Sequence, residues 1–341
     1  MSLLSGRATY KPFLYEECFE YWMKQQQAHW LHTEIAMASD IQDWKLGLSQ
    51  TEKDVVGGVL KGFVQTELVV NDYWTNRVAK WFPHPEIAMM ATCFGNMETI
   101  HTIAYAQLND SLGLVDYEAF MQEPAAKAKL DRLLDPEMGG EKKPHVMDGS
   151  SVIESEWLTN EDLSRKARSL AIFSGFTEGV ALFSSFAILL SFSRFNKLKG
   201  VGQIIAFSIR DESLHSEAGC WLFREFIKEN PQLWTDKLKK EIYEAARMTV
   251  ALEDDFIDAV FAEGTVEGLD PKDLKAFIRA RANVKLGDLG LKTNWKNIDH
   301  EALKHMEWFD YLSSGIESQD FFAQRVSGYS KGTLDTDKMF K

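Results

Sequence analysis

Three residues with chemically active side chains, Glu98, His101 and Tyr105, lie three and then four positions apart in the stretch NMETIHTIAYAQL. In an α-helix with roughly 3.6 residues per turn, these steps return to nearly the same side, so the carboxylate, imidazole and phenol would form one stripe. The neighbouring residues are mostly apolar, which predicts a helix buried on most sides. A charged Glu and a His are costly in such a place unless they pair or bind a metal ion.

The same Glu-x-x-His spacing occurs once more, at Glu212 and His215 in RDESLHSEAG, and nowhere else in the chain. A further glutamate precedes each pair: Glu67 lies 31 residues before Glu98, and Glu178 lies 34 residues before Glu212. Both of these glutamates stand in the middle of an apolar stretch. Each half of the chain therefore contains a Glu followed by a Glu-x-x-His pair, on successive long helices.

These side chains have the composition of a site for two metal ions. Four carboxylates and two imidazoles supply hard oxygen and borderline nitrogen ligands, which suit iron or manganese. One Glu from each of two helices and a Glu-x-x-His pair from each of two others form the ligand pattern of ferritin-like di-iron and di-manganese bundles. The four-helix unit would span about residues 50–228. The alternative is that Glu67 and Glu178 are partly solvated and that the two histidines are hydrogen-bonded core residues.

Proline, glycine and capping residues divide the chain into long helices joined by short breaks. Ser49 and Glu52 form a capping-box pattern at the start of a helix that reaches about Lys80, and a second helix runs from Pro85 to Gly113. Further helices are expected at 117–134, 158–195, 202–229, 232–263, 271–285 and 299–311, with an exposed loop at 135–151. Strand alternation is scarce, so the fold class is all-α. We expect one helical domain at 1–325, followed by a flexible tail at 326–341.

The composition argues against several classes of protein. The chain of 341 residues has a net charge of −13, which is unfavourable for binding nucleic acid, and its hydrophobic content of 45% can supply a large core. The three cysteines, Cys18, Cys93 and Cys220, lack the spacing of a disulfide framework or a thiolate zinc site. We find neither a signal-peptide pattern nor an apolar run long enough to cross a membrane, and we expect a protein of the reducing cytoplasm.

The chain contains, in this order, the segments HWLHTEIAMASDIQDW, QTELVVNDY, METIHTIAYAQL, FTEGVALFSSF, RDESLH and FFAQRVSGYSKG. Together they resemble the small (beta) subunit of class I ribonucleotide reductases, and the resemblance covers roughly residues 10–330. It implies two metal ions per chain, iron or manganese, bound by Glu67, Glu98, His101, Glu178, Glu212 and His215. It also implies that oxygen chemistry at these ions generates a radical on Tyr105, which a large (alpha) subunit uses to reduce ribonucleotides.

The resemblance further implies a route by which the radical leaves the site. Trp30 and Asp211 would connect the site to the large subunit through His101, and Tyr329 would extend the route into a C-terminal tail that docks the large subunit. The small subunits are expected to form a homodimer. Each of these residues also has a structural alternative: Trp30 could serve packing alone, Asp211 could pair with Arg210 on an exposed face, and Tyr329 could lie in a solvated tail.

Three features depart from the usual pattern of the family. Position 67 is Glu where many members carry Asp, and Ser208 stands where an aliphatic neighbour of the tyrosine is expected. The tail ends in DTDKMFK instead of a strongly acidic, aromatic sequence. Leu182 and Phe186 would complete the pocket that protects a radical on Tyr105. An ordinary core tyrosine is the alternative at position 105.

Two other functions would use the same ligands. A ferritin-type iron store shares them, but its subunits are much shorter and need neither the Trp30 segment nor a docking tail. A monooxygenase or ligand-binding oxidase would direct the same metals at an organic substrate. The sequence leaves open whether the ions are iron or manganese, and whether the oxidising equivalent rests on Tyr105 or on the metals. It shows no Gly-rich phosphate-binding loop, which is consistent with nucleotide binding by the large subunit.

Overall fold

The computed structural model describes residues 2–114, 159–262 and 264–313, together with positions 124, 127, 128 and 131. Within these residues there is no β-strand, only an isolated bridge between Val266 and Leu269. The all-α prediction is therefore confirmed. The loop expected at 135–151 and the tail at 326–341 lie outside the described residues, as does the helix expected at 117–134 except for those four positions.

Helices of three kinds make up most of the described residues. The α-helices are α1 Glu16–Gln27, α2 Ala38–Gln42, α3 Gln50–Asp72, α4 Ala79–Trp81, α5 Pro85–Leu112, α8 Asn160–Ile172, α9 Phe183–Ser191, α10 Lys199–Glu229, α11 Asp236–Val260, α12 Pro271–Asp288 and α13 His300–His305. Short 3-10 helices cover His32–Glu34, Phe192–Phe195 and Pro231–Leu233, and π-helical segments cover Asp43–Gly47, Tyr73–Val78 and Phe173–Thr177. A last helical segment covers 307–313.

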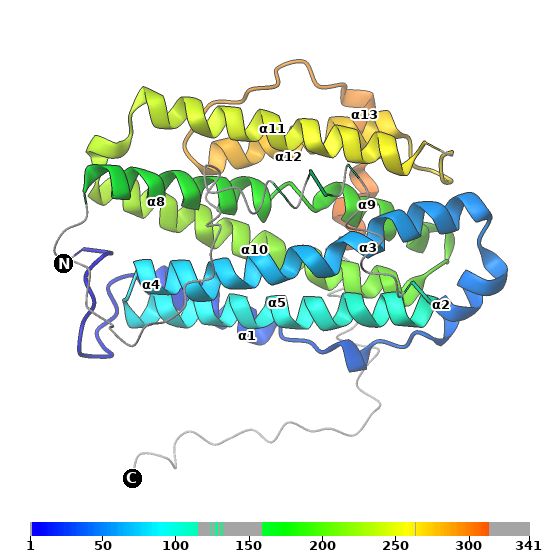
Figure 1. Ribbon diagram of the computed structural model, residues 1–341, viewed down its shortest axis with the longest axis horizontal. Coiled ribbons are helices and arrows are strands. Elements are labelled where there is room, and N and C mark those ends of the chain that lie inside the picture. Colours follow the sequence, from blue (N-terminus) through cyan, green and yellow to red (C-terminus); the bar gives the residue numbers. More distant parts are fainter. Residues whose placement is uncertain are drawn as a thin grey trace, which may run out of the picture.

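The long helices run side by side in layers (Figure 1). On one side α3 packs against α5, and α1 packs against the outer part of α5; α8, α9 and α10 form the middle; α11 and α12 cover the opposite side. The expected four-helix unit consists of α3, α5, α10 and the interrupted pair α8 and α9. Among the described helices, none combines the length and the apolar character needed to span a bilayer.

The predicted ends of the first two long helices are confirmed. The Ser49 hydroxyl accepts a hydrogen bond from the Glu52 N–H, and the Glu52 carboxylate accepts one from the Ser49 N–H (2.7 Å), so the capping box is complete. Pro85 is the first residue of α5, where its missing N–H is not needed. Gly113 follows α5 with a φ of 75°, a left-handed conformation that glycine adopts without strain.

The single helix expected at 158–195 is wrong, because the chain breaks the helix twice. α8 ends in the π-helical segment Phe173–Thr177, and α9 begins only after an irregular turn. The N–H of Glu178 bonds the carbonyl of Phe173, as in a π-helix (3.0 Å). A Cβ on Gly179 would lie 2.5 Å from the Gly175 carbonyl oxygen and 2.7 Å from Ser216 Oγ, so the turn packs too tightly against α10 for a side chain there. Residues 171–192 are buried on nearly all sides, so their hydrophobic pattern could not reveal the break.

The other expected helices occur with shifted bounds. The helix at 49–80 is α3 continued by the π-helical segment Tyr73–Val78 and α4, and the helix at 202–229 begins earlier, at Lys199. The helix at 232–263 shortens to α11, the helix at 271–285 extends to Asp288, and the helix at 299–311 is interrupted at Met306. Shifts of this size are common because the last turn of a helix is often irregular.

α10, which carries the second Glu-x-x-His pair, is anchored at its first turn by a distant segment. Its N-cap residue, Leu198, has a left-handed conformation and supplies no capping side chain. Asp40 of α2 accepts hydrogen bonds from the N–H groups of Gly200 (3.0 Å) and Val201 (2.8 Å) instead, and Asp43 accepts one from Leu198 (2.9 Å). These carboxylates also complement the positive end of the helix dipole. They fix the helix on which two of the predicted ligands lie.

Candidate metal centre

The six predicted ligands converge inside the four-helix unit. Glu67 comes from α3, one Glu-x-x-His pair from α5, Glu178 from the turn that follows the π-helical segment Phe173–Thr177, and the other pair from α10. All six side chains are buried, with exposures of 0% or 1%. The idea that Glu67 and Glu178 are partly solvated is therefore wrong.

The ligand atoms form two groups that share two carboxylates. One group consists of Glu67, Glu98, His101 and Glu212, and the other of Glu98, Glu178, Glu212 and His215; within each, one atom per residue lies within 4.8 Å of the others. His101 Nδ1 lies 3.1 Å from Glu98 Oε2 and 3.1 Å from Glu212 Oε1. His215 Nδ1 lies 2.8 Å from Glu98 Oε1. Glu98 and Glu212 thus belong to both groups, and each group contains one histidine.

Several buried atoms of the cluster have no hydrogen-bond partner among the described residues. They are both carboxylate oxygens of Glu67 and of Glu212, Glu98 Oε1, Glu178 Oε2 and His215 Nδ1. Buried polar atoms are normally hydrogen-bonded, and leaving several carboxylate oxygens unpaired together is costly. Cations between these oxygens and nitrogens would remove that cost. The residues present therefore fit two divalent metal ions, with oxygen and imidazole ligands that suit iron or manganese.

Burial or the close approach of the carboxylates raises the pKa values of several side chains in the cluster. Burial, together with the Glu98 and Glu212 carboxylates, raises the pKa of Glu67 well above its usual value, and burial has the same effect on the pKa of Glu178. Burial disfavours the charged form of His215, but the Glu98 and Glu212 carboxylates outweigh it and raise the pKa of His215 to about 9. A cation that bound His215 at neutral pH would therefore have to displace a proton from this histidine.

Trp30 and Asp211 meet the cluster at His101. Trp30 Nε1 donates to Asp211 Oδ2 (2.8 Å), and His101 Nε2 lies 3.1 Å from the same oxygen. The Trp30 and His101 rings are stacked with centroids 5.9 Å apart. Burial raises the pKa of Asp211, but hydrogen bonding to His101 and the positive charges of His101 and Arg210 outweigh burial and lower it. Asp211 does pair with Arg210, whose Nε lies 3.5 Å from Oδ1, but Asp211 is 1% exposed, so the expected exposed face is wrong.

Tyr105 lies one helical turn beyond His101, with ring centroids 6.0 Å apart, and is completely buried. Its ring stacks on Phe63 at 4.7 Å, and Phe63 in turn contacts Phe186. The Ser208 hydroxyl donates to the carbonyl of Ile204 (3.1 Å) and also interacts with the Tyr105 hydroxyl, whose pKa it lowers against the larger effect of burial. Burial raises the pKa of Tyr105 well above its usual value, so the phenol is protonated at neutral pH.

The sequence patterns do not predict two residues that contact the ligand groups. Trp74 Nε1 donates to Glu178 Oε1 (2.6 Å), and Gln25 lies between Asp211 and His215. The signal for Gln25 was present, because it continues the buried stripe of α1 that Cys18 and Tyr21 begin at helical spacing. Trp74 had no comparable signal, since it lies in an apolar stretch and is one of ten tryptophans in the chain.

Two further predicted residues lie away from the ligand groups. Leu182 is buried just before α9, and Tyr329 lies outside the described residues.

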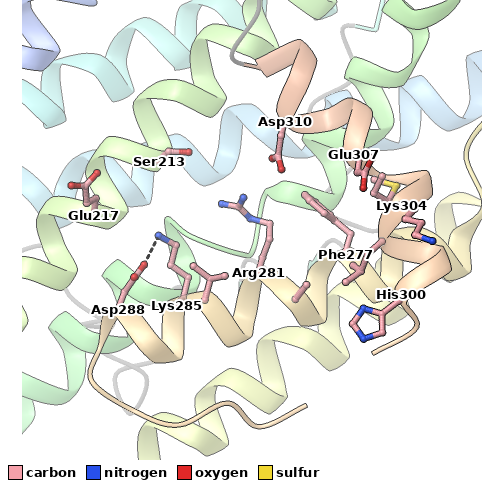
Figure 2. Close-up of a pocket in the computed structure, with 14 residues that line it drawn as sticks. Ser213, Glu217, Phe277, Arg281, Lys285, Asp288, His300, Lys304, Glu307 and Asp310 are labelled. Carbon is pink, nitrogen blue, oxygen red and sulfur yellow. Dashed lines mark hydrogen bonds and ion pairs between the residues drawn. The ribbon is translucent and has the colours of Figure 1, made fainter. Parts of the chain in front are cut away.

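A separate cavity of about 830 Å³ lies between α10, α12 and α13 (Figure 2). None of the predicted site residues that the structure describes lines it. Arg281 points into it from α12, stacks over the Phe183 ring at 3.3 Å and donates from Nε to the Gly179 carbonyl (3.2 Å). Arg281 thereby supports the irregular turn that presents Glu178.

A helical bundle in which two Glu-x-x-His pairs and two further glutamates meet has the architecture of ferritin-like di-metal carboxylate proteins. The family model described as "Ribonucleotide reductase, small chain" matches residues 7–301. The chain belongs to the ribonucleotide reductase small-chain family, which confirms the resemblance found in the sequence.

Individual members of this family are similar to the chain over nearly its whole length. The chain is 32% identical to the probable ribonucleoside-diphosphate reductase small subunit 376L of Invertebrate iridescent virus 6, over 98% of both chains. It is 26% identical to the ribonucleoside-diphosphate reductase subunit beta of Chlamydia pneumoniae, over 93% of this chain and 88% of the relative.

Solved structures support the fold. The ribonucleotide reductase R2 subunit from Clostridium botulinum superposes with a TM-score of 0.76 at 18% identity, over 92% of this chain and 94% of that one. The dimanganese(II)-NrdF of Streptococcus sanguinis superposes with a TM-score of 0.69 at 22% identity, over 89% of this chain and 99% of that one. The ferritin-like helical fold predicted from the ligand pattern is therefore confirmed.

Proposed function

We propose that this chain is the radical-generating subunit of a ribonucleoside-diphosphate reductase, and that it stores its radical on Tyr105. The observation that carries the proposal is the pair of buried ligand groups that share Glu98 and Glu212, with Tyr105 one helical turn from His101. The radical would pass to a large subunit, which reduces ribonucleotides to deoxyribonucleotides. Family membership supports this assignment over an iron store or a monooxygenase.

Six residues would hold two metal ions per chain. Glu67 and His101 would serve one ion and Glu178 and His215 the other, with Glu98 and Glu212 shared. Bound iron or manganese would supply redox chemistry: with oxygen or a reduced oxygen species as the oxidant, it would oxidise a nearby aromatic side chain. The dimanganese(II) neighbour supports manganese as a candidate alongside iron.

Tyr105 is suited to hold an unpaired electron. Its phenol is protonated at neutral pH, so its oxidation to a neutral radical releases one electron and one proton together. The side chain is completely buried and stacks on Phe63, which keeps water and external reductants away from the ring.

Trp30, Asp211 and His101 would conduct the radical out of the site. Asp211 is held in its charged form and accepts N–H groups from both rings on one oxygen, so the three side chains form a continuous hydrogen-bonded path. Proton and electron can move along such a path without opening the core to water. Tyr329 would continue the path at the interface with the large subunit.

The proposed assembly contains the large subunit and a second copy of this chain. The tail at 326–341 would dock the large subunit, and a homodimer is the expected state of the small subunit. Cys18, Cys93 and Cys220 are all free thiols, which supports a reducing compartment such as the cytoplasm.

Aerobic reconstitution of the protein with Fe(II), and separately with Mn(II), tests the proposal. We expect two ions per chain by elemental analysis, a phenoxyl radical in the electron paramagnetic resonance spectrum, and turnover when the large subunit is added. Glu178→Ala and His215→Ala should each lower the metal content, because each removes a ligand. Unchanged metal content in both would overturn the di-metal assignment. Accumulation of ferric mineral would indicate iron storage, and a hydroxylated organic product would indicate an oxygenase.

A further inference from the structure

Gln25 is a buried amide on α1, outside the four-helix unit, that contacts His215 of the ligand cluster and Asp211 beside the cluster. Its exposed fraction is 0%. Its Nε2 donates to Asp211 Oδ1 (2.9 Å), and its Oε1 lies 3.2 Å from His215 Nε2. Gln25 therefore connects Asp211, which contacts His101, with His215 of the second ligand group.

The hydrogen-bonding capacity of these groups leaves one arrangement. A carboxylate only accepts, so the NH₂ end of the amide must face Asp211 and its oxygen must face His215. The amide oxygen also only accepts, so His215 Nε2 must carry a hydrogen and donate it. In the neutral ring, Nδ1 then keeps its lone pair, and this is the atom that faces Glu98 Oε1 at 2.8 Å.

His101 is oriented by the same carboxylate without an intermediary. Its Nε2 lies 3.1 Å from Asp211 Oδ2, which directs its Nδ1 toward Glu98 and Glu212. Asp211 therefore determines the protonated nitrogen of both histidines, one directly and the other through Gln25. Both rings present Nδ1 to the cluster.

We propose that Gln25 is a positioning residue that fixes the Nε2–H tautomer and the ring orientation of His215, and that couples His215 through Asp211 to His101 and Trp30. The inference rests on the di-metal site of the proposed function and adds a residue of α1 to its support. Without the amide, the Nε2–H of His215 loses its buried acceptor and Asp211 loses one of its donors. Groups that orient a metal-ligating histidine commonly change metal affinity about 10- to 100-fold when they are removed.

The test compares Gln25→Met with the matched control Gln27→Met. Met has nearly the volume of Gln and no hydrogen-bonding amide, and Gln27 is an exposed residue at the end of the same helix. Anaerobic titration of the full chain with Mn(II), followed by calorimetry and electron paramagnetic resonance, measures both affinities and the ligand field of the bound ions. We expect Gln25→Met to bind one of the two ions at least tenfold more weakly, with an altered Mn(II) spectrum, whereas Gln27→Met should match the wild type.

A purely structural role for Gln25 gives a different result. It would lower the unfolding temperature of the metal-free protein and leave both Mn(II) affinities and the spectrum unchanged, which would overturn the proposal. Gln25→Asn guards against a failure of Gln25→Met to fold, because it stays polar but is too short to span Asp211 and His215. Wild-type affinities in Gln25→Asn would also overturn the proposal. If the wild type itself bound no Mn(II), the proposed function would fail, and the Gln25 role with it.

Discussion

The indole Nε1 of Trp74 donates a hydrogen bond of 2.6 Å to Oε1 of Glu178, and both side chains are buried. Each residue belongs to an irregular part of the chain: Trp74 lies in the π-helical segment that follows α3, and Glu178 follows the π-helical segment after α8. The bond occupies one carboxylate oxygen and leaves Oε2 without a hydrogen-bond partner. π-helical turns often occur at functional sites, and here two of them meet at one ligand.

Trp74→Phe should weaken metal binding while the bundle stays folded. The substitution keeps an aromatic ring against Phe94 and Phe173 but removes the N–H that orients Glu178. We expect a loss of metal affinity of about tenfold or more, and a loss of stability of about 1–3 kcal/mol. Mn(II) titration and thermal unfolding measure the two effects. Trp22→Phe, which alters a half-buried tryptophan of α1 that stacks on Phe19, is the control and should bind Mn(II) like the wild type.

Glu67→Leu should abolish full metal loading and leave the metal-free protein at least as stable as the wild type. Both oxygens of Glu67 are buried and have no hydrogen-bond partner among the described residues, so this side chain destabilises the fold when no ion is present. Replacement of buried ionic groups by apolar side chains is often neutral or stabilising by about 1–4 kcal/mol. Thermal unfolding of the metal-free proteins measures this, with Glu244→Leu on the exposed face of α11 as the control. A clear loss of stability in Glu67→Leu would mean that Glu67 is a structural residue.

The capping box of α3 should make stability depend on pH through Glu52. Burial raises the pKa of Glu52, but hydrogen bonds from Lys197 (2.6 Å) and Ser49 outweigh burial and lower it. A carboxyl with a lowered pKa stabilises the fold above its unfolded pKa of about 4.3, and this contribution disappears as the pH falls through the lower folded value. At pH 7, Glu52→Gln should cost about 1 kcal/mol.

Unfolding temperatures at a series of pH values check this. The difference in unfolding temperature between wild type and Glu52→Gln should be largest at neutral pH and should vanish in acid. Lys197→Met should show a smaller difference with the same dependence on pH. A difference that persists unchanged in strong acid would show that the loss comes from packing and not from charge.

The sequence could predict which six side chains converge because the spacing of the two Glu-x-x-His pairs follows helix geometry. Glu98 and His101, like Glu212 and His215, stand three residues apart, which places both side chains of each pair on one face whatever the rest of the fold does. Glu67 and Glu178 followed from their position in apolar stretches of the right order. The capping box at Ser49 was equally local, and it is present as expected.

The parts that the sequence could not predict depend on contacts between distant segments. The turn at Glu178 is irregular because Gly179 meets α10 and α12, and no property of residues 158–195 taken alone reports those neighbours. Trp74 and Gln25 support the site through hydrogen bonds that span 104 and about 190 residues, respectively. Asp40, which anchors α10, lies 160 residues away from the amide it binds.

Tyr105→Phe should remove the radical without disturbing the fold. The Ser208 hydroxyl beside it also donates to the carbonyl of Ile204, so loss of the Tyr105 hydroxyl should change stability by no more than about 1 kcal/mol. Metal content should stay at two ions per chain, while the radical signal and turnover with the large subunit should vanish. Tyr73→Phe is a matched control: it removes a buried hydroxyl that bonds Ser169 (2.8 Å), so it should lower stability and keep the radical. Full turnover by Tyr105→Phe would place the oxidising equivalent on the metals.

Deletion of residues 336–341 should weaken association with the large subunit and leave the metal site intact. The segment contains Met339 and Phe340, a pair of large apolar residues in an otherwise polar stretch that follows Tyr329. Apolar anchors commonly supply much of the binding energy of a peptide, so we expect the dissociation constant to rise about tenfold or more. Surface plasmon resonance with the large subunit measures this, and Lys338→Ala is the control for a change of charge alone. Metal content and the Tyr105 radical should match the wild type, because the residues of the proposed metal site come from α3, α5, α10 and the turn before α9. Undiminished binding after the deletion would place docking on the helical body and leave Tyr329 outside the path of radical transfer.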